Sequence, residues 1–234
     1  MRRWVIACLV LALCLPLGCA GAVQEGYTVF NGSREEPRIA ITVDDCYDIN
    51  HVTEVLDLCE AHGVPVTFFV VGKALREEDA EVWLRALDLG CEIGNHTWDH
   101  VSLPRETDED IISQLDRVEV KLDKVLGKHY EMQMMRPPYG KLTLDPERRS
   151  DKRVVRAIEA AGYVHAVRWD VSETDAKKAS WKVKNGSILL YHANLADVAC
   201  LVELIPVLLE KGFEPVTVSE LLGYEKPILE EIEQ

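Results

Sequence analysis

Two adjacent carboxylates and two histidines are the residues of this sequence best suited to chemistry. Asp44 and Asp45 follow the apolar segment 38–43 (RIAITV), and His96 and His100 lie about fifty residues later, in segment 96–100 (HTWDH). One carboxylate and two imidazoles can bind zinc and leave coordination positions open for water and substrate, as a catalytic site requires. The other carboxylate is then free to act as a base. Together these residues predict a metal-dependent hydrolase.

Each pair alone is weak evidence. An Asp pair after a strand often caps the next helix, and two histidines four positions apart often arise by chance. Their placement adds weight, because both pairs follow short apolar runs, 38–43 and 91–94 (CEIG), that are typical of strands. Parallel strands end at one edge of a sheet, so we expect the two pairs to meet there.

The elements that must position these residues alternate along the chain. Strand-like runs at 38–43, 66–71, 91–94, 132–136, 163–169, 187–192 and 214–218 are interspersed with helix-like runs at 51–62, 78–89, 108–126, 151–161 and 196–211. In the third helix, Ile111, Leu115, Val118, Leu122 and Val125 recur at helical spacing, with Thr107 as its N-cap. Such alternation predicts an α/β fold with a parallel sheet.

Five ordered segments resemble the motifs of a known family. They are residues 42–45 (TVDD), 96–100 (HTWDH), 136–140 (RPPYG), 169–175 (WDVSETD) and 188–192 (ILLYH). In this order they are similar to the motifs of the polysaccharide deacetylases, the NodB-homology group or carbohydrate esterase family 4. The resemblance runs from about residue 38 to about 222. It implies a deformed (β/α) barrel of about seven parallel strands, with an open groove.

The resemblance also assigns roles. It implies that Asp45, His96 and His100 bind a divalent metal, most readily Zn²⁺, and that Asp44 is the base. Arg136 would hold Asp44 ionised and oriented through paired hydrogen bonds. The loop at 136–140 would point the backbone N–H of Tyr139 inward as an oxyanion donor.

His192 is the expected general acid. In the family the histidine at this position protonates the leaving nitrogen, and a carboxylate of the fourth motif keeps it cationic. Asp175 aligns with that carboxylate, but it is followed by Ala176 where the family usually has Trp, and the connection to His192 is short. Asp170 is therefore the alternative partner, and a third interpretation is that neither carboxylate serves. Cys46 stands where the family usually has Gly.

The N-terminus predicts export. Residues 1–22 combine two arginines, an apolar stretch and a zone of small residues around Cys19, the features of a signal peptide. Cleavage before Cys19 would leave a lipidated protein at the outer face of the membrane, and cleavage after 20–22 (AGA) would release a secreted one. Residues 23–37 are expected to be a tether, and residues 38–234 one catalytic domain. Contact with a membrane is expected only through this N-terminal lipid or signal.

Charge and cysteine content limit the partners. The net charge of −14 argues against nucleic acid and favours a neutral glycan. Outside residues 1–22, four cysteines remain, Cys46, Cys59, Cys91 and Cys200, which permit three pairings or four free thiols.

These features predict an enzyme that removes N-acetyl groups from a GlcNAc-containing cell-surface polysaccharide, with peptidoglycan as the first candidate. An O-acetyl esterase acting on a xylan-like glycan is the second interpretation, since the same site would attack an ester. A glycan-binding lipoprotein with little turnover is the third.

Overall fold

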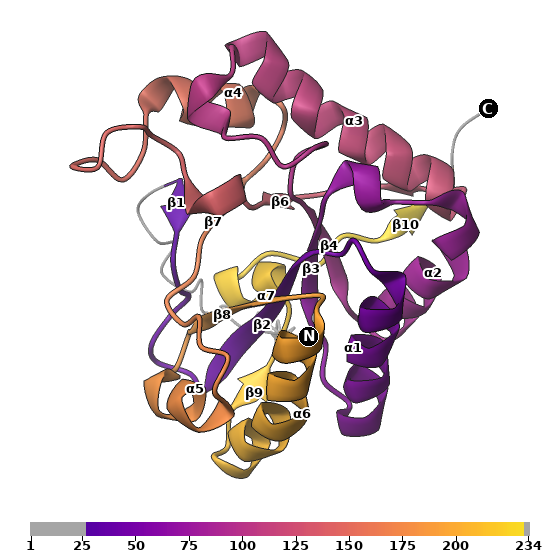
Figure 1. The fold of residues 1–234 in the computed structure, drawn as a ribbon, viewed down its shortest axis with the longest axis vertical. Helices are drawn as coiled ribbons and strands as arrows, with labels where there is room; N and C mark the ends of the chain where they lie inside the picture. Colours follow the sequence, from indigo (N-terminus) through magenta and orange to yellow (C-terminus); the bar gives the residue numbers. More distant parts are fainter. Residues whose placement is uncertain (1–26, 232–234) are drawn as a thin grey trace, which may run out of the picture.

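The computed structural model describes residues 27–231, which form a half-barrel of parallel strands surrounded by helices (Figure 1). The sheet follows the order β1-β7-β6-β4-β3-β2-β8, with β9 paired to β2, and each of these pairs is parallel. The strands are β1 (Thr28–Val29), β2 (Arg38–Asp45), β3 (Thr67–Val70), β4 (Glu92–Asn95), β6 (Met134–Met135), β7 (His165–Val167), β8 (Ile188–His192) and β9 (Glu214–Pro215). The predicted deformed barrel of seven strands is confirmed.

Helices lie around the outside of this sheet, from α1 and α2 on the right of Figure 1, through α3 at the top, to α4 at the upper left. They are α1 (Ile49–His62), α2 (Ala80–Asp88), α3 (Asp108–Leu126), α4 (Lys152–Ala160), α5 (Ala176–Lys182), α6 (Leu195–Glu210) and α7 (Val218–Leu222). Four single turns of 3₁₀ helix occur at Gly72–Ala74, Glu77–Asp79, Leu103–Arg105 and Pro138–Gly140, and β5 (His129–Tyr130) and β10 (Leu229–Glu230) form a separate antiparallel pair. The five predicted helices are confirmed, whereas α5 and α7 were not predicted.

Helix α3 shows how local sequence sets these elements. The Thr107 hydroxyl accepts a hydrogen bond from the Asp110 N–H at 3.1 Å, which satisfies one free donor at the start of the helix. Its apolar positions at helical spacing are all buried, and Gly127 ends the helix with a φ of 67°. The helix therefore begins and packs as its sequence predicts.

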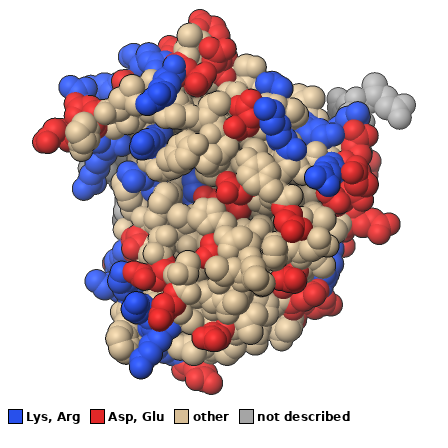
Figure 2. Space-filling model, in the orientation of Figure 1, with Lys and Arg blue, Asp and Glu red and all other residues tan. Residues whose placement is uncertain are grey.

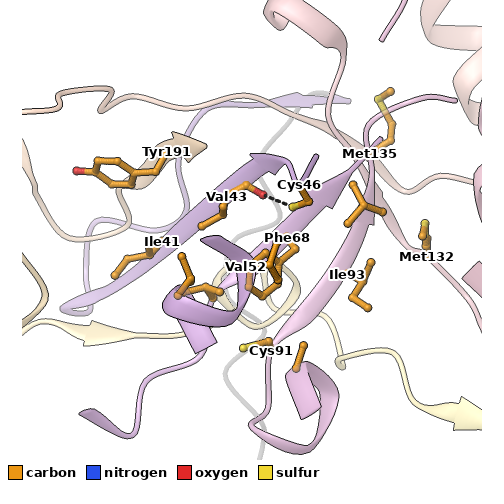
Figure 3. Packing of buried hydrophobic residues seen from close by; sticks show 14 of the residues in the cluster. Ile41, Val43, Cys46, Val52, Phe68, Cys91, Ile93, Met132, Met135 and Tyr191 are labelled. Carbon is orange, nitrogen blue, oxygen red and sulfur yellow. Dashed lines mark hydrogen bonds between the residues drawn. The ribbon is translucent and has the colours of Figure 1, made fainter. Parts of the chain in front are cut away.

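The main hydrophobic core lies between the sheet and the helices (Figure 3). Ile41 and Val43 of β2, Phe68 of β3 and Ile93 of β4 are fully buried there and lie near Val52 of α1. Burial of a side chain of this size contributes about 1.5–3 kcal/mol. This packing gives the ends of β2 and β4, which carry the functional residues, a rigid base.

The segment expected to be a tether belongs partly to the domain. Thr28 and Val29 form β1, which pairs with β7, and Val29 is buried. Arg34 forms an ion pair with Asp170 at 2.6 Å. The predicted boundary at residue 38 is therefore wrong, because backbone hydrogen bonds of the sheet extend to this segment. The predicted signal and Cys19 lie outside the described residues.

The cysteines separate into one close pair and two single residues. Cys59, near the end of α1, and Cys91, just before β4, have sulfur atoms 3.9 Å apart, and both side chains are buried. Cys46 and Cys200 are buried elsewhere in the core. Within residues 27–231, no helix is both long and apolar enough to cross a membrane.

Candidate active site at the carboxyl edge of the sheet

The predicted site residues gather where the strands end. Asp44 and Asp45 end β2, and His192 ends β8 in direct register with Asp44. His96 follows β4, and Arg136 follows β6. The parallel sheet thus brings together residues that are up to about 150 positions apart in the chain.

Asp45, His96 and His100 form a cluster whose geometry fits a metal ion. Their ligand atoms all lie within 4.8 Å of one another, and Asp45 Oδ1 is 3.6 Å from His96 Nε2 and 3.5 Å from His100 Nε2. Ligands about 2.1 Å from a tetrahedral zinc ion are about 3.4 Å apart, so these separations match. Asp45 Oδ1 is buried and has no hydrogen-bond partner among the described residues. A cation would satisfy it.

His96 is prepared to act as a neutral ligand. Its Nδ1 lies 2.8 Å from the carbonyl oxygen of Arg136, so Nδ1 carries the proton. The lone pair of Nε2 is then free to bind a metal ion together with Asp45 and His100. Burial lowers the pKa of His96 to about 3, although the Arg136 carbonyl and the charge of Asp45 act in the opposite direction. The imidazole is therefore uncharged at neutral pH, as metal binding requires.

Asp44 is held by a buried guanidinium. Arg136 Nη1 donates to Asp44 Oδ1 at 2.6 Å and to the Thr42 hydroxyl at 2.6 Å, and Arg136 is fully buried. Its other nitrogens donate to the carbonyl oxygens of Val167 and Arg168, each at 3.3 Å. Burial raises the pKa of Asp44, and the charge and hydrogen bond of Arg136 limit that rise. Such a carboxylate is a stronger base than an exposed one.

The loops of the site share an uncommon backbone conformation. Among the described residues, five non-glycine residues have positive φ values, between 59° and 69°. They are Asp45, Cys46, Thr97, His100 and Tyr139. This conformation is costly for residues with a Cβ, and such strain clusters at functional sites. The φ of 62° at Cys46 explains why the family usually has Gly there.

Tyr139 forms one wall of the site. Its ring packs edge-on against His100, with centroids 4.6 Å apart, and 61% of the residue is exposed. The oxyanion role of its backbone N–H stays a prediction.

The partner of His192 differs from both sequence-based candidates. Asp197 Oδ2 lies 3.0 Å from His192 Nδ1 and also accepts a hydrogen bond from the His192 backbone N–H at 2.7 Å. This bond raises the pKa of His192, and burial opposes the rise. Burial would raise the pKa of Asp197, but its bonds with His192 outweigh that effect and lower it. His192 is thus held toward its cationic form.

Asp175 and Asp170 have structural roles. Asp175 is the N-cap of α5 and accepts from the Lys178 N–H at 2.8 Å. Asp170 accepts from Arg34, from the Ser187 hydroxyl and from the Ile188 N–H. Neither carboxylate pairs with His192, so both assignments are wrong and the third interpretation, that neither serves, agrees with the structure.

Asp197 escaped the sequence analysis because it follows the fifth motif instead of lying in the fourth. A signal was present: Asn194 caps α6 by accepting from the Ala196 and Asp197 N–H groups, so the first turn of that helix lies directly beside the end of β8. A carboxylate three residues after an N-cap, and five after the strand-end histidine, faces back toward that histidine.

Comparison with known proteins identifies the family of this chain. The family model described as polysaccharide deacetylase matches residues 31–166, more than half of the chain. The chain therefore belongs to the polysaccharide deacetylase family, as its motifs predict.

Individual relatives narrow the comparison. A peptidoglycan-N-acetylglucosamine deacetylase of Bacillus cereus is 30% identical over 214 residues, which cover 85% of this chain and 94% of the relative. PgdA of Listeria monocytogenes, which has the same description, is 28% identical over 82% of this chain, but the chain spans only 40% of the length of PgdA.

The fold has solved counterparts. The structure of Bacillus subtilis PdaA, described as a family 4 carbohydrate esterase, has a TM-score of 0.72 and 26% identity, and the match covers 84% of this chain and 85% of PdaA. PdaA is named a peptidoglycan-N-acetylmuramic acid deacetylase.

Proposed function

We propose that this protein is a metal-dependent hydrolase that removes N-acetyl groups from a GlcNAc-containing polysaccharide of the cell surface, with peptidoglycan as the first candidate. The observation that carries the proposal is the cluster of Asp45, His96 and His100, whose separations suit one metal ion. Beside it lie a base, Asp44, which is paired with Arg136, and an acid, His192, which is paired with Asp197. The named activities of the relatives support the choice of glycan.

The cluster would hold a divalent metal, most readily Zn²⁺. When bound, such an ion lowers the pKa of a water molecule to about 7 and polarises the carbonyl of the acetyl group. Two imidazoles and one carboxylate are a donor set that catalytic zinc sites use.

Asp44 takes a proton from the attacking water. Arg136 binds its Oδ1 at 2.6 Å, which leaves Oδ2 as the oxygen that accepts the proton, and this oxygen lies 3.6 Å from His96 Nε2, next to the metal cluster. Arg136 thus orients the base.

His192 gives a proton to the leaving nitrogen. Asp197 occupies its Nδ1, so the proton that is transferred comes from Nε2. The C–N bond then breaks, the acetyl group leaves as acetate and the sugar keeps a free amine. The backbone N–H of Tyr139 would donate to the oxyanion that forms during attack.

We also propose that the protein acts outside the cytoplasmic membrane, as a lipoprotein or as a secreted enzyme. Residues 1–22 support this location, because they resemble a signal peptide. The proposed substrate supports it as well, since peptidoglycan lies outside the cytoplasmic membrane. Radiolabelled palmitate would be incorporated into the full chain and lost in Cys19→Ser if the lipoprotein form is correct. Release of unlabelled protein into the medium would favour secretion.

The central test of the reaction is release of acetate from defined oligosaccharides. N-acetylated peptidoglycan fragments should yield acetate and an equal amount of free amine, while O-acetylated xylo-oligosaccharides should yield little. His96→Ala should abolish the reaction, and His62→Ala, at the far end of α1, should not. Acetate from the ester alone would establish the esterase instead, and acetate from neither would indicate a glycan-binding protein.

A further inference from the structure

A cavity next to the candidate active site is rich in arginine. It has a volume of about 540 Å³ and lies on the far side of Tyr139, between the loop at 139–149 and the start of the segment after β7. Five cationic side chains line it, namely Arg105, Lys141, Arg148, Arg149 and Arg168, against one acidic side chain, Asp145. Neither the proposed mechanism nor the predicted motifs use these cations.

This positive charge is unusual for the chain. Segment 141–156 (KLTLDPERRSDKRVVR) has six basic and three acidic residues, a net charge of +3, in a protein of net charge −14. Figure 2 shows Lys and Arg side chains gathered at the upper left, over α4 and the loop that precedes it, while acidic side chains crowd the right side. A local field of this sign attracts anions to one end of an acidic molecule.

Three of the four guanidinium groups have no anionic partner. Arg148 forms an ion pair with Asp145 at 3.3 Å, but within residues 27–231 Arg105, Arg149 and Arg168 form none. Arg149 and Arg168 lie over the ring of Phe30, at 5.6 and 4.8 Å from its centroid. Arg168 Nε is buried without a hydrogen-bond partner. Burial, and then the charge of Arg149, lowers the pKa of Arg168. An anion between Arg149 and Arg168 would accept a hydrogen bond from the unpaired Nε and would offset the repulsion between the two positive charges.

The cavity is linked to the catalytic residues through the loop at 139–140 and through Arg136. Tyr139 lines the cavity and packs against His100. Gly140 brings the loop close to Arg168, since a Cβ at this position would lie 3.1 Å from Arg168 Nε. The carbonyl oxygen of Arg168 accepts from Arg136, which holds Asp44. Only the loop at 139–140 thus lies between the basic cavity and the metal cluster.

We propose that Arg149 and Arg168 form a subsite for a carboxylate carried by the glycan, so that the enzyme prefers an N-acetyl sugar with a carboxylate substituent over a neutral one. The inference rests on the proposed function and narrows its substrate. Guanidinium groups bind carboxylates through two parallel hydrogen bonds, which gives both affinity and orientation. The expectation of a neutral glycan came from the total charge, and the local charge at this cavity reverses it.

The test compares two substrates that differ in one charge. One is a peptidoglycan oligosaccharide whose N-acetylmuramic acid carries a free lactyl carboxylate, and the other is its methyl ester. The wild type should show kcat/KM at least about tenfold higher for the free acid, a difference that 0.5 M NaCl should reduce. In Arg149→Met/Arg168→Met the ratio of the two values should fall about tenfold, through KM.

Lys152→Met is the matched control, because Lys152 is in the same basic segment but does not line this cavity. It should leave the ratio unchanged. A ratio near one in the wild type, or an unchanged ratio in the double variant, would overturn the subsite. If no substrate yields acetate, the proposed function fails, and calorimetric binding of the acid and the ester still tests the subsite. Equal affinities for acid and ester would reject it.

Discussion

Replacement of Asp197 by Asn tests the part of the site that the structure corrected. Asn keeps the shape of Asp197 but removes the charge that holds His192 as a cation. A hydrogen bond to a charged group contributes about 1.5–3 kcal/mol, and about 1.4 kcal/mol changes a rate tenfold, so the loss in kcat lies between about 10-fold and 150-fold. Because 42% of the His192 side chain is exposed and water screens the pair, we expect about tenfold.

The pH dependence should change in a defined direction. Asp197 is the largest cause of the raised pKa of His192, and Asp44 and Asp45 add to it. His192 must be protonated to act as an acid, so activity falls as the pH rises through its pKa. Asp197→Asn lowers this pKa and should move the basic limb of the kcat profile to lower pH.

The free energy of unfolding should also depend on pH through His192 and Asp197. The raised pKa of His192 contributes stability that is fully present below its ordinary value of 6.5 and is lost as the pH rises through the folded-state value. The lowered pKa of Asp197 contributes stability above its ordinary value of 3.8 that is lost as the pH falls through the folded-state value. Urea unfolding should therefore show the largest loss for Asp197→Asn between about pH 4 and 6.5.

Asp175→Asn is the control, since Asn caps a helix about as well as Asp and Asp175 caps α5. Steady-state acetate release between pH 5 and 10 measures both limbs. The reasoning is refuted if Asp197→Asn keeps the wild-type kcat and basic limb, or if Asp175→Asn moves that limb.

Three further substitutions and one chemical treatment test the remaining roles. Asp44→Asn should keep the metal and lose about 10²–10⁴-fold in activity, whereas Asp45→Asn should lose metal first, and equal metal loss by elemental analysis would reject the division of roles. Arg136→Met should lower the free energy of unfolding by about 3–5 kcal/mol, because it leaves a buried carboxylate without its partner, and a loss under 1 kcal/mol in urea would contradict this. Oxidation with a disulfide reagent should link Cys59 to Cys91 with loss of two hydrogens, and a tryptic map that instead shows both as free thiols would reject the pairing.

The sequence was sufficient for most of the fold because the central strands are mostly or fully buried and the helices are amphipathic. β2 and β4 read as apolar runs, and Thr107 marked the start of α3. The two residues of β1 are too few to show such a pattern, and they form a strand only because they pair with β7. Pairing also sets the length of β6: of the predicted strand at 132–136, only Met134 and Met135 pair with neighbouring strands.

The metal cluster and its base could be anticipated because these residues lie at, or shortly after, the ends of two strands of one parallel sheet. The partner of His192 could not, because Asp175 matched the motif order while the geometry depends on where the chain turns after β8. The arginine-lined cavity depends on contacts between Phe30, Arg149 and Arg168 that are far apart in the chain. The net charge of the chain does not reveal this cavity, because it is a sum over all residues.

The most direct test of the account is a metal titration of the purified protein. After removal of metal by a chelator, confirmed by elemental analysis, the protein should release no acetate from N-acetylated peptidoglycan fragments. Addition of Zn²⁺ should restore activity until one ion is bound per chain, and His96→Ala should neither bind the ion nor regain activity. Acetate release at the original rate by the metal-free protein would contradict the assignment of Asp45, His96 and His100 as its catalytic metal site.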